Sequence, residues 1–185
     1  MWPSPNLIGA FYFLSEVAIS LMRRSQPGAA SKDATFWLIW CVLSGSVLGL
    51  LFVAAMLPSL RLPHAELLYF VGLPVFVAGL LVRWFAIIQL GRFFTVDVKI
   101  ASDHKIIDTG LYRYVRHPSY SGVLIGFFGL ALCTGNLLSL IIAFVPPFLV
   151  LRTRMNVEEK ALAEGLGEPY RDYMRRTKRL FPLIY

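Results

Sequence analysis

The sequence predicts an all-α, polytopic integral membrane protein, and three observations lead to this fold class. Of the 185 residues, 57% are hydrophobic and the mean hydropathy is +0.63, whereas an ordinary soluble domain has about 45–50% apolar residues. The segment Phe36–Leu57 contains no charged residue over 22 positions, and at about 1.5 Å per residue it can cross the hydrocarbon layer. The basic residues lie at the ends of the apolar segments, where they act as topology signals and lipid contacts and not as a nucleic-acid surface.

Two further apolar segments are expected in the first half of the chain. Leu7–Met22 ends before a pair of arginines without a small-residue cleavage site, so we expect a retained helix, with a cleaved signal peptide as the alternative. Ala65–Leu90 is also long enough to span a bilayer. These segments contain Glu16 and Arg83, and charges within a membrane are costly when they face lipid. A structural pairing is the preferred interpretation of the two charges, and a functional role is the alternative.

The second half of the membrane region is predicted to be a tight helical hairpin. Pro118–Cys133 and Leu137–Leu151 are separated by only three residues. Each segment has about 15 residues, which is marginal for a complete crossing, so about five transmembrane or membrane-embedded helices are expected in all. The pair Pro146 and Pro147 predicts a kink in the last helix.

The distribution of charge predicts the orientation and the division of the chain. With five spans, 16 of the 18 Lys and Arg residues fall on one side, so the positive-inside rule places the N-terminus outside and the C-terminus in the cytosol. We expect a membrane bundle over residues 1–151, which includes a cytosolic loop at 91–117, and a helical cytosolic tail over 152–185 that completes a cofactor site. The two cysteines lack the paired spacing of a metal site, and no metal is predicted.

The stretch Gly110–Gly122 concentrates most of the reactive side chains between a polar loop and an apolar helix. His117 precedes a proline, which disfavours helical geometry at the histidine, and Pro118 is suited to the first position of the next helix. The N-terminus of such a helix favours a carboxylate or a phosphate. The alternative is a membrane-surface loop whose arginines and tyrosines anchor it among lipid headgroups.

Several short motifs follow one another along the second half of the chain. They are L-G-R-F-F-T from Leu90, H-K-I-I-D-T-G-L-Y from His104, R-H-P-S-Y-S-G from Arg116, R-x-R-x-x-x-E-E from Arg152 and G-E-x-Y-x-x-Y from Gly167. In this order and spacing the region Leu90–Pro182 resembles the isoprenylcysteine carboxyl methyltransferase family and its prokaryotic relatives. The R-H-P-x-Y element alone also resembles membrane sterol reductases and phospholipid methyltransferases, and the motifs of the tail favour the methyltransferase.

The resemblance implies an enzyme that uses S-adenosylmethionine to methylate a lipophilic membrane substrate, with a carboxylate as the expected acceptor. It implies a catalytic role for Arg154, which would hold an acidic group of the substrate, and for Glu159. Glu158 or Glu159 would accept from the hydroxyl or amine groups of the cofactor. The cofactor contacts that it implies are Lys99, His104, Lys105, Ile106, Ile107, Tyr112, His117, Pro118, Ser119, Tyr120 and Glu158.

Alternatives remain open at this point for the residues and for the function. The two glutamates could form a solvated helix face, and Arg154 could be a headgroup anchor. The functional alternatives are a phospholipid or other lipid N- or O-methyltransferase, a nicotinamide-dependent sterol-type reductase, and a small membrane scaffold or transporter module. The expected partners are a lipophilic or lipidated substrate and membrane lipids, and the expected location is a prokaryotic inner or plasma membrane.

Overall fold

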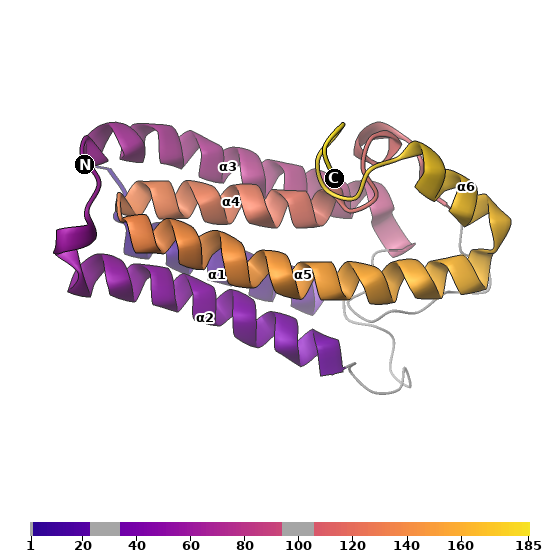
Figure 1. Ribbon diagram of the computed structural model, residues 1–185, viewed down its shortest axis with the longest axis horizontal. Coiled ribbons are helices and arrows are strands. Elements are labelled where there is room, and N and C mark those ends of the chain that lie inside the picture. The colour runs from indigo at the N-terminus through magenta and orange to yellow at the C-terminus, as the bar shows by residue number, and fades with distance from the viewer. Residues whose placement is uncertain (1, 23–33, 94–105) are drawn as a thin grey trace.

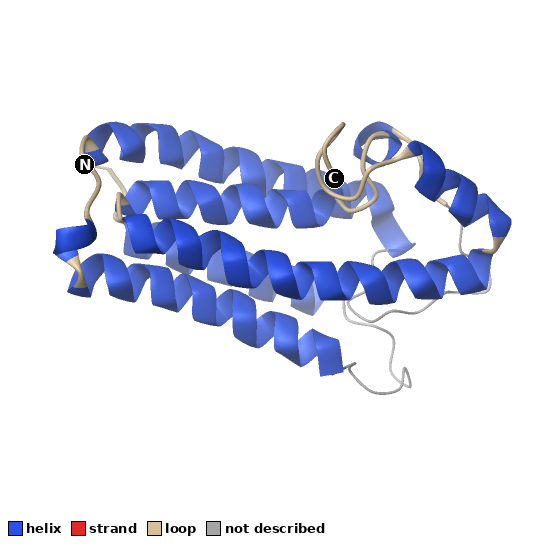
Figure 2. Cartoon of the chain, in the orientation of Figure 1, coloured by secondary structure: helices blue, strands red, loops and turns tan. Residues whose placement is uncertain are grey.

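The computed structural model describes residues 2–22, 34–93 and 106–185, and this part of the chain consists of helices and loops (Figure 2). The α-helices are α1 Pro5–Met22, α2 Ala34–Met56, α3 Ala65–Leu90, α4 Pro118–Thr134, α5 Leu137–Leu166 and α6 Glu168–Arg176, and the short 3-10 helices are η1 Pro58–Leu60, η2 Gly91–Phe93 and η3 Gly110–Arg113. No strand occurs among the described residues, which confirms the all-α prediction.

Five of these helices are apolar and run side by side as a bundle (Figure 1). Helices α2, α3 and α5 are long and apolar enough to cross a membrane, and α1 and α4 are shorter apolar helices. The predicted polytopic membrane protein is therefore confirmed. The N-terminus lies at one end of the bundle, and the C-terminal segment lies toward the other end, beside α6.

Helix α4 forms the centre of the bundle, with 13 of its 17 residues buried. It packs against α1, α2, α3 and α5, most extensively against α3. Small residues allow the two backbones of α3 and α4 to approach closely. A Cβ atom added to Gly79 would lie 2.3 Å from the backbone nitrogen of Gly126, and one added to Gly129 would lie 2.3 Å from that of Phe76. The glycines of these two helices thus set the distance between them.

The predicted helical hairpin is confirmed between α4 and α5. Gly135 ends α4 in the left-handed region, with a φ of 61°, and Asn136 caps the next helix. The Asn136 side-chain oxygen accepts from the amides of Leu138 and Ser139, as an N-cap residue does. Its amide nitrogen donates to the carbonyl of Leu57 at 3.0 Å, which ties the hairpin to the end of α2.

Helix α5 is longer than the apolar segment predicted from the sequence. It is assigned as one helix of 30 residues that continues through Pro146 and Pro147 and ends at Leu166. At about 1.5 Å per residue this is about 45 Å, whereas the hydrocarbon core of a bilayer is about 30 Å thick. Its last part projects beyond the other helices and leads to α6 (Figure 1). The span and the first part of the predicted tail are therefore one continuous element.

Candidate active site

The site begins where α4 starts, because the chain before it is fixed by the C-terminal segment. The amide of Arg116 donates to the carbonyl of Lys178 at 2.7 Å, and that of His117 donates to the carbonyl of Arg179 at 3.0 Å. Ser121 donates its hydroxyl to the carbonyl of Leu180 at 2.5 Å. His117 itself is non-helical, with φ −125° and ψ 56°, as expected for a residue before proline. Residues 178–180 therefore form a strap that positions the first turn of α4.

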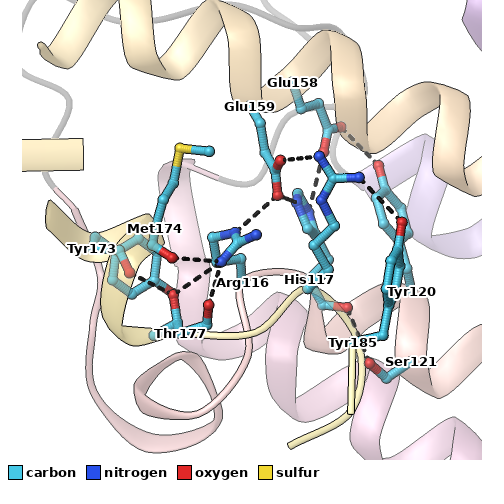
Figure 3. Close-up of polar contacts among 11 residues, drawn as sticks. Arg116, His117, Tyr120, Ser121, Glu158, Glu159, Tyr173, Met174, Thr177 and Tyr185 are labelled. Carbon is cyan, nitrogen blue, oxygen red and sulfur yellow. Dashed lines mark hydrogen bonds and ion pairs between the residues drawn. The ribbon is translucent and has the colours of Figure 1, made fainter. Parts of the chain in front are cut away.

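The side chains of this turn meet the polar part of α5 (Figure 3). His117 Nε2 lies 3.1 Å from an oxygen of Glu159, and its Nδ1 lies 3.5 Å from an oxygen of Glu158. The Tyr120 hydroxyl donates to Glu158 at 2.7 Å. The rings of His117 and Tyr120 are stacked, with centroids 5.5 Å apart. One imidazole thus bridges two adjacent carboxylates.

Glu159 contacts three basic side chains, and only 3% of it is exposed. One oxygen accepts from Arg116 Nε at 2.8 Å and contacts His117, and the other accepts from Arg179 Nη2 at 2.6 Å. Burial alone would raise the pKa of the carboxyl group, but hydrogen bonds and charge from His117 and Arg116 lower the pKa of Glu159 to about 2. Glu159 is therefore a stable carboxylate and a weak base.

Arg154 lies one turn before Glu158 on the same face of α5. Its Nε donates to Glu158 at 2.9 Å, and the arginine is 2% exposed. The Glu158 side chain is 20% exposed. Because Arg154 and Glu159 are buried, this face of α5 is not a solvated helix face. Of Glu158 and Glu159, Glu158 is the more accessible to solvent.

Helix α6 closes the site on the side away from Tyr120. Arg116 Nη1 donates to the carbonyl of Met174 at 3.1 Å and also to that of Thr177. The Tyr173 hydroxyl donates to the carbonyl of Tyr112 at 2.7 Å, which fixes α6 on η3. Burial raises the pKa of Tyr173, as it does for Tyr112 and Tyr170, so these phenols stay neutral at physiological pH.

The structure brings the side chains of five predicted site residues together, and the other predicted residues that it describes have different contacts. The five that meet are His117, Tyr120, Arg154, Glu158 and Glu159. Pro118 is buried at the first position of α4, and Ser119 contacts α3. Tyr112 donates its hydroxyl to the Ala86 carbonyl, and Ile106 and Ile107 are half-buried in the segment before η3. Lys99, His104 and Lys105 lie outside the described residues.

Two arginines of the site were not among the predicted site residues. Arg116 belongs to the R-H-P-S-Y-S-G motif, and its position next to His117 could have indicated their shared partner, Glu159. Arg179 lies in a charged stretch with no motif, and its contact with Glu159 depends on the strap that returns to α4. The sequence contains no local signal for that contact.

Comparison with known proteins identifies similarity to one family of membrane enzymes. The sequence model of the isoprenylcysteine carboxyl methyltransferase family matches residues 70–164. The chain is 35% identical over 115 residues to protein-S-isoprenylcysteine O-methyltransferase B of Arabidopsis thaliana, covering 61% of this chain and 58% of the relative. It is 33% identical over 115 residues to the protein-S-isoprenylcysteine O-methyltransferase of Saccharomyces cerevisiae, covering 61% of this chain and 48% of that protein.

A solved structure is similar over nearly the whole fold. It is the structure of the eukaryotic intramembrane Ras methyltransferase, an isoprenylcysteine carboxyl methyltransferase. The match has a TM-score of 0.71 and 25% sequence identity, and it covers 97% of this chain and 65% of that one. The chain thus spans less than two thirds of the length of each of these relatives.

Proposed function

The chain belongs to the isoprenylcysteine carboxyl methyltransferase family, and we propose that it transfers a methyl group from S-adenosylmethionine to a carboxylate carried by a lipidated substrate in the membrane. The observation that carries the proposal is the contact between the His117–Tyr120 turn of α4 and the glutamate pair of α5, at the end of an apolar bundle. Such a position allows an apolar substrate chain to stay in the membrane while its polar end reaches the site.

The charge of the cluster favours an anionic acceptor. Among the described side chains it combines three arginines with two glutamates, which leaves one positive charge in excess. The arginines are Arg116, Arg154 and Arg179. The resemblance to the family assigns Arg154 to the acidic group of the substrate, and its burial at the end of the bundle supports that role. An ammonium or a neutral amine would gain less from this charge balance.

The residues present also fit the methyl donor. S-adenosylmethionine has a carboxylate, an amine, ribose hydroxyls and a flat base, and when bound it supplies a transferable methyl group on a sulfonium sulfur. Glu158 is a partly exposed acid suited to accept from an amine or a hydroxyl group, and the stacked rings of His117 and Tyr120 provide a flat aromatic surface. Arginines nearby complement the carboxylate of the donor.

The chain's own residues then act mainly by positioning. A carboxylate acceptor is already a nucleophile, so transfer requires alignment of the reacting atoms and no general base. Glu159 would be a poor base with a pKa of about 2. We assign it the role of holding Arg116, His117 and Arg179 in place, so it is a positioning residue and not a group that reacts.

A methyl-transfer assay on the full chain in lipid nanodiscs tests the proposal. Label from methyl-tritiated S-adenosylmethionine should appear as a base-labile ester on an N-acetylated S-prenyl cysteine. The carboxamide analogue of that compound, and N-acetylcysteine without the prenyl group, serve as matched controls and should remain unlabelled. Base-stable label in the phospholipids would support the lipid N-methyltransferase alternative. Binding of a nicotinamide cofactor without binding of S-adenosylhomocysteine would support the reductase and overturn the proposal.

A further inference from the structure

Helix α1 contributes one buried acid, Glu16, to the interior of the membrane bundle. Both of its oxygens accept from Arg83 of α3, from Nε and from Nη2, each at 2.5 Å. Each of the two residues is 8% exposed. The pairing predicted for these intramembrane charges is therefore present. A planar guanidinium is well suited to two parallel bonds of this kind.

The remaining nitrogen of Arg83 connects this pair to the candidate active site. Arg83 Nη1 donates to the Ser119 hydroxyl at 3.0 Å and lies 3.4 Å from the Ser119 carbonyl. Ser119 lies in the first turn of α4, between His117 and Tyr120, which face the glutamates of α5. The same turn is thus fixed by Arg83 on one side and by α5 on the other.

Near Arg83, α3 packs more closely against α4 than against α1. The backbones of α3 and α4 are close here, since a Cβ atom on Gly122 would lie 2.6 Å from the Arg83 amide nitrogen. By contrast, an open apolar groove of about 570 Å³ lies between α1 and the middle of α3. The Tyr69 hydroxyl of α3 donates to the carbonyl of Pro3, just before α1, at 2.5 Å. Further along, the rings of Tyr12 and Phe76 meet edge to face, and Glu16 pairs with Arg83.

We propose that Glu16 and Arg83 are positioning residues that set the first turn of α4, and through it the orientation of His117 and Tyr120. The buried Nη1 group of Arg83 needs an acceptor, and Ser119 in the first turn of α4 provides it, so the orientation of the guanidinium and the position of this turn are coupled. The two hydrogen bonds to Glu16 fix the orientation of the Arg83 guanidinium, and in this orientation Nη1 points toward Ser119. Among the described residues, helix α1 contributes no side chain to the cluster around Glu158 and Glu159, but through Glu16 and Arg83 it affects the orientation of His117 and Tyr120 in that cluster.

The test compares three variants of the full chain in nanodiscs by hydrogen exchange and by S-adenosylhomocysteine binding. The double variant Glu16→Leu with Arg83→Met removes both charges at similar volume, a change that buried ion pairs often tolerate. Amide exchange in residues 119–122 should rise at least about tenfold, the scale of one lost charge-assisted hydrogen bond. Exchange in residues 124–132 should not change.

Arg83→Lys and Tyr69→Phe complete the comparison. Arg83→Lys keeps a charge beside Glu16, but an ammonium lacks the planar set of donors, so exchange in 119–122 should also rise. Tyr69→Phe removes the hydrogen bond between α3 and the residue Pro3 before α1, and it should leave exchange in 119–122 unchanged. Unchanged exchange in the first two variants, or an equal rise in Tyr69→Phe, overturns the proposal.

The expected loss of ligand affinity, about tenfold in the double variant, rests on the proposed function and is judged separately. If the unaltered chain does not bind S-adenosylhomocysteine, the proposed function is wrong, and hydrogen exchange still decides whether Glu16 and Arg83 position α4. If the unaltered chain binds and the double variant binds equally well, the positioning role is wrong and the proposed function stands.

Discussion

Replacing Glu159 with glutamine is expected to destabilise the protein by about 3 kcal/mol at neutral pH. Glu159 is 3% exposed and lies against three cationic or donor side chains. Its pKa is about 2, compared with 4.5 for an unperturbed carboxyl group. This difference corresponds to about 3 kcal/mol of preferential stabilisation of the carboxylate in the folded state. Glutamine retains the shape but not the charge, so Arg116 and Arg179 would lose their shared anion.

The pH dependence of this effect follows from the direction of the pKa change. Because the folded-state pKa is lowered, the stabilisation is complete above the unfolded pKa of about 4.5 and is lost as the pH falls toward about 2. About 2 kcal/mol of it should disappear between pH 7 and pH 3 in the unaltered chain. Glu159→Gln has no such group, so its stability should fall less steeply over the same interval.

Unfolding in detergent, followed by circular dichroism with increasing dodecyl sulfate at pH 7 and at lower pH, measures both effects. Glu164→Gln is the matched control, because Glu164 is an exposed glutamate of the same helix. The control should lie within about 0.5 kcal/mol of the unaltered chain. If Glu159→Gln is equally mild at pH 7, or if its acid dependence matches that of the unaltered chain, the account of Glu159 as the buried anionic anchor is refuted.

Three further predictions concern packing, the division of roles and topology. Gly129→Ala should destabilise the bundle by about 1–3 kcal/mol in the same unfolding assay, because the added Cβ atom would meet the α3 backbone. Gly126→Ala is the control and should be nearly neutral, because the nearest neighbour of its Cβ atom lies 4.0 Å away. Equal effects of the two substitutions would contradict the packing argument. Arg154→Ala should keep S-adenosylhomocysteine affinity within about twofold in isothermal titration yet lose most turnover, since positioning can be worth several kcal/mol, and a parallel loss of affinity would reject this division of roles. A reporter fused after Tyr185 should be cytosolic and one fused before Met1 external, because 16 of the 18 basic residues favour one side, and an external C-terminus would exclude this orientation.

Local physical rules were sufficient to locate the apolar helices and the non-helical residue before α4. A span such as Ala65–Leu90 is recognisable because a membrane requires a continuous apolar segment of sufficient length, and its predicted bounds agree with those of α3. The non-helical backbone of His117 follows from the proline after it. The tight hairpin follows from the three residues between two apolar segments. Each of these properties depends on residues that are close together in the chain.

The contacts within the candidate site required the tertiary structure. The sequence motifs indicated His117 and the pair Glu158 and Glu159, but not which atoms meet, and they gave no reason to select Arg179. The apolar segment was expected to end at Leu151, because hydropathy reports the edge of the membrane, whereas helical hydrogen bonding continues to Leu166. This continuation carries the glutamates beyond the hydrocarbon to the first turn of α4.

The sequence by itself therefore determined the membrane class, the positions of the helices and the family resemblance, since hydropathy and local backbone preferences depend on neighbouring residues. Only the tertiary structure decided that Arg83 joins Glu16 to Ser119, and that the strap at 178–180 brings Arg179 to Glu159. Residues separated by 67 or 20 positions in the chain meet in these contacts. The contact of Arg83 with Ser119 depends on how closely α3 and α4 pack, and the glycines of that interface, which have no side chain, allow the short distance.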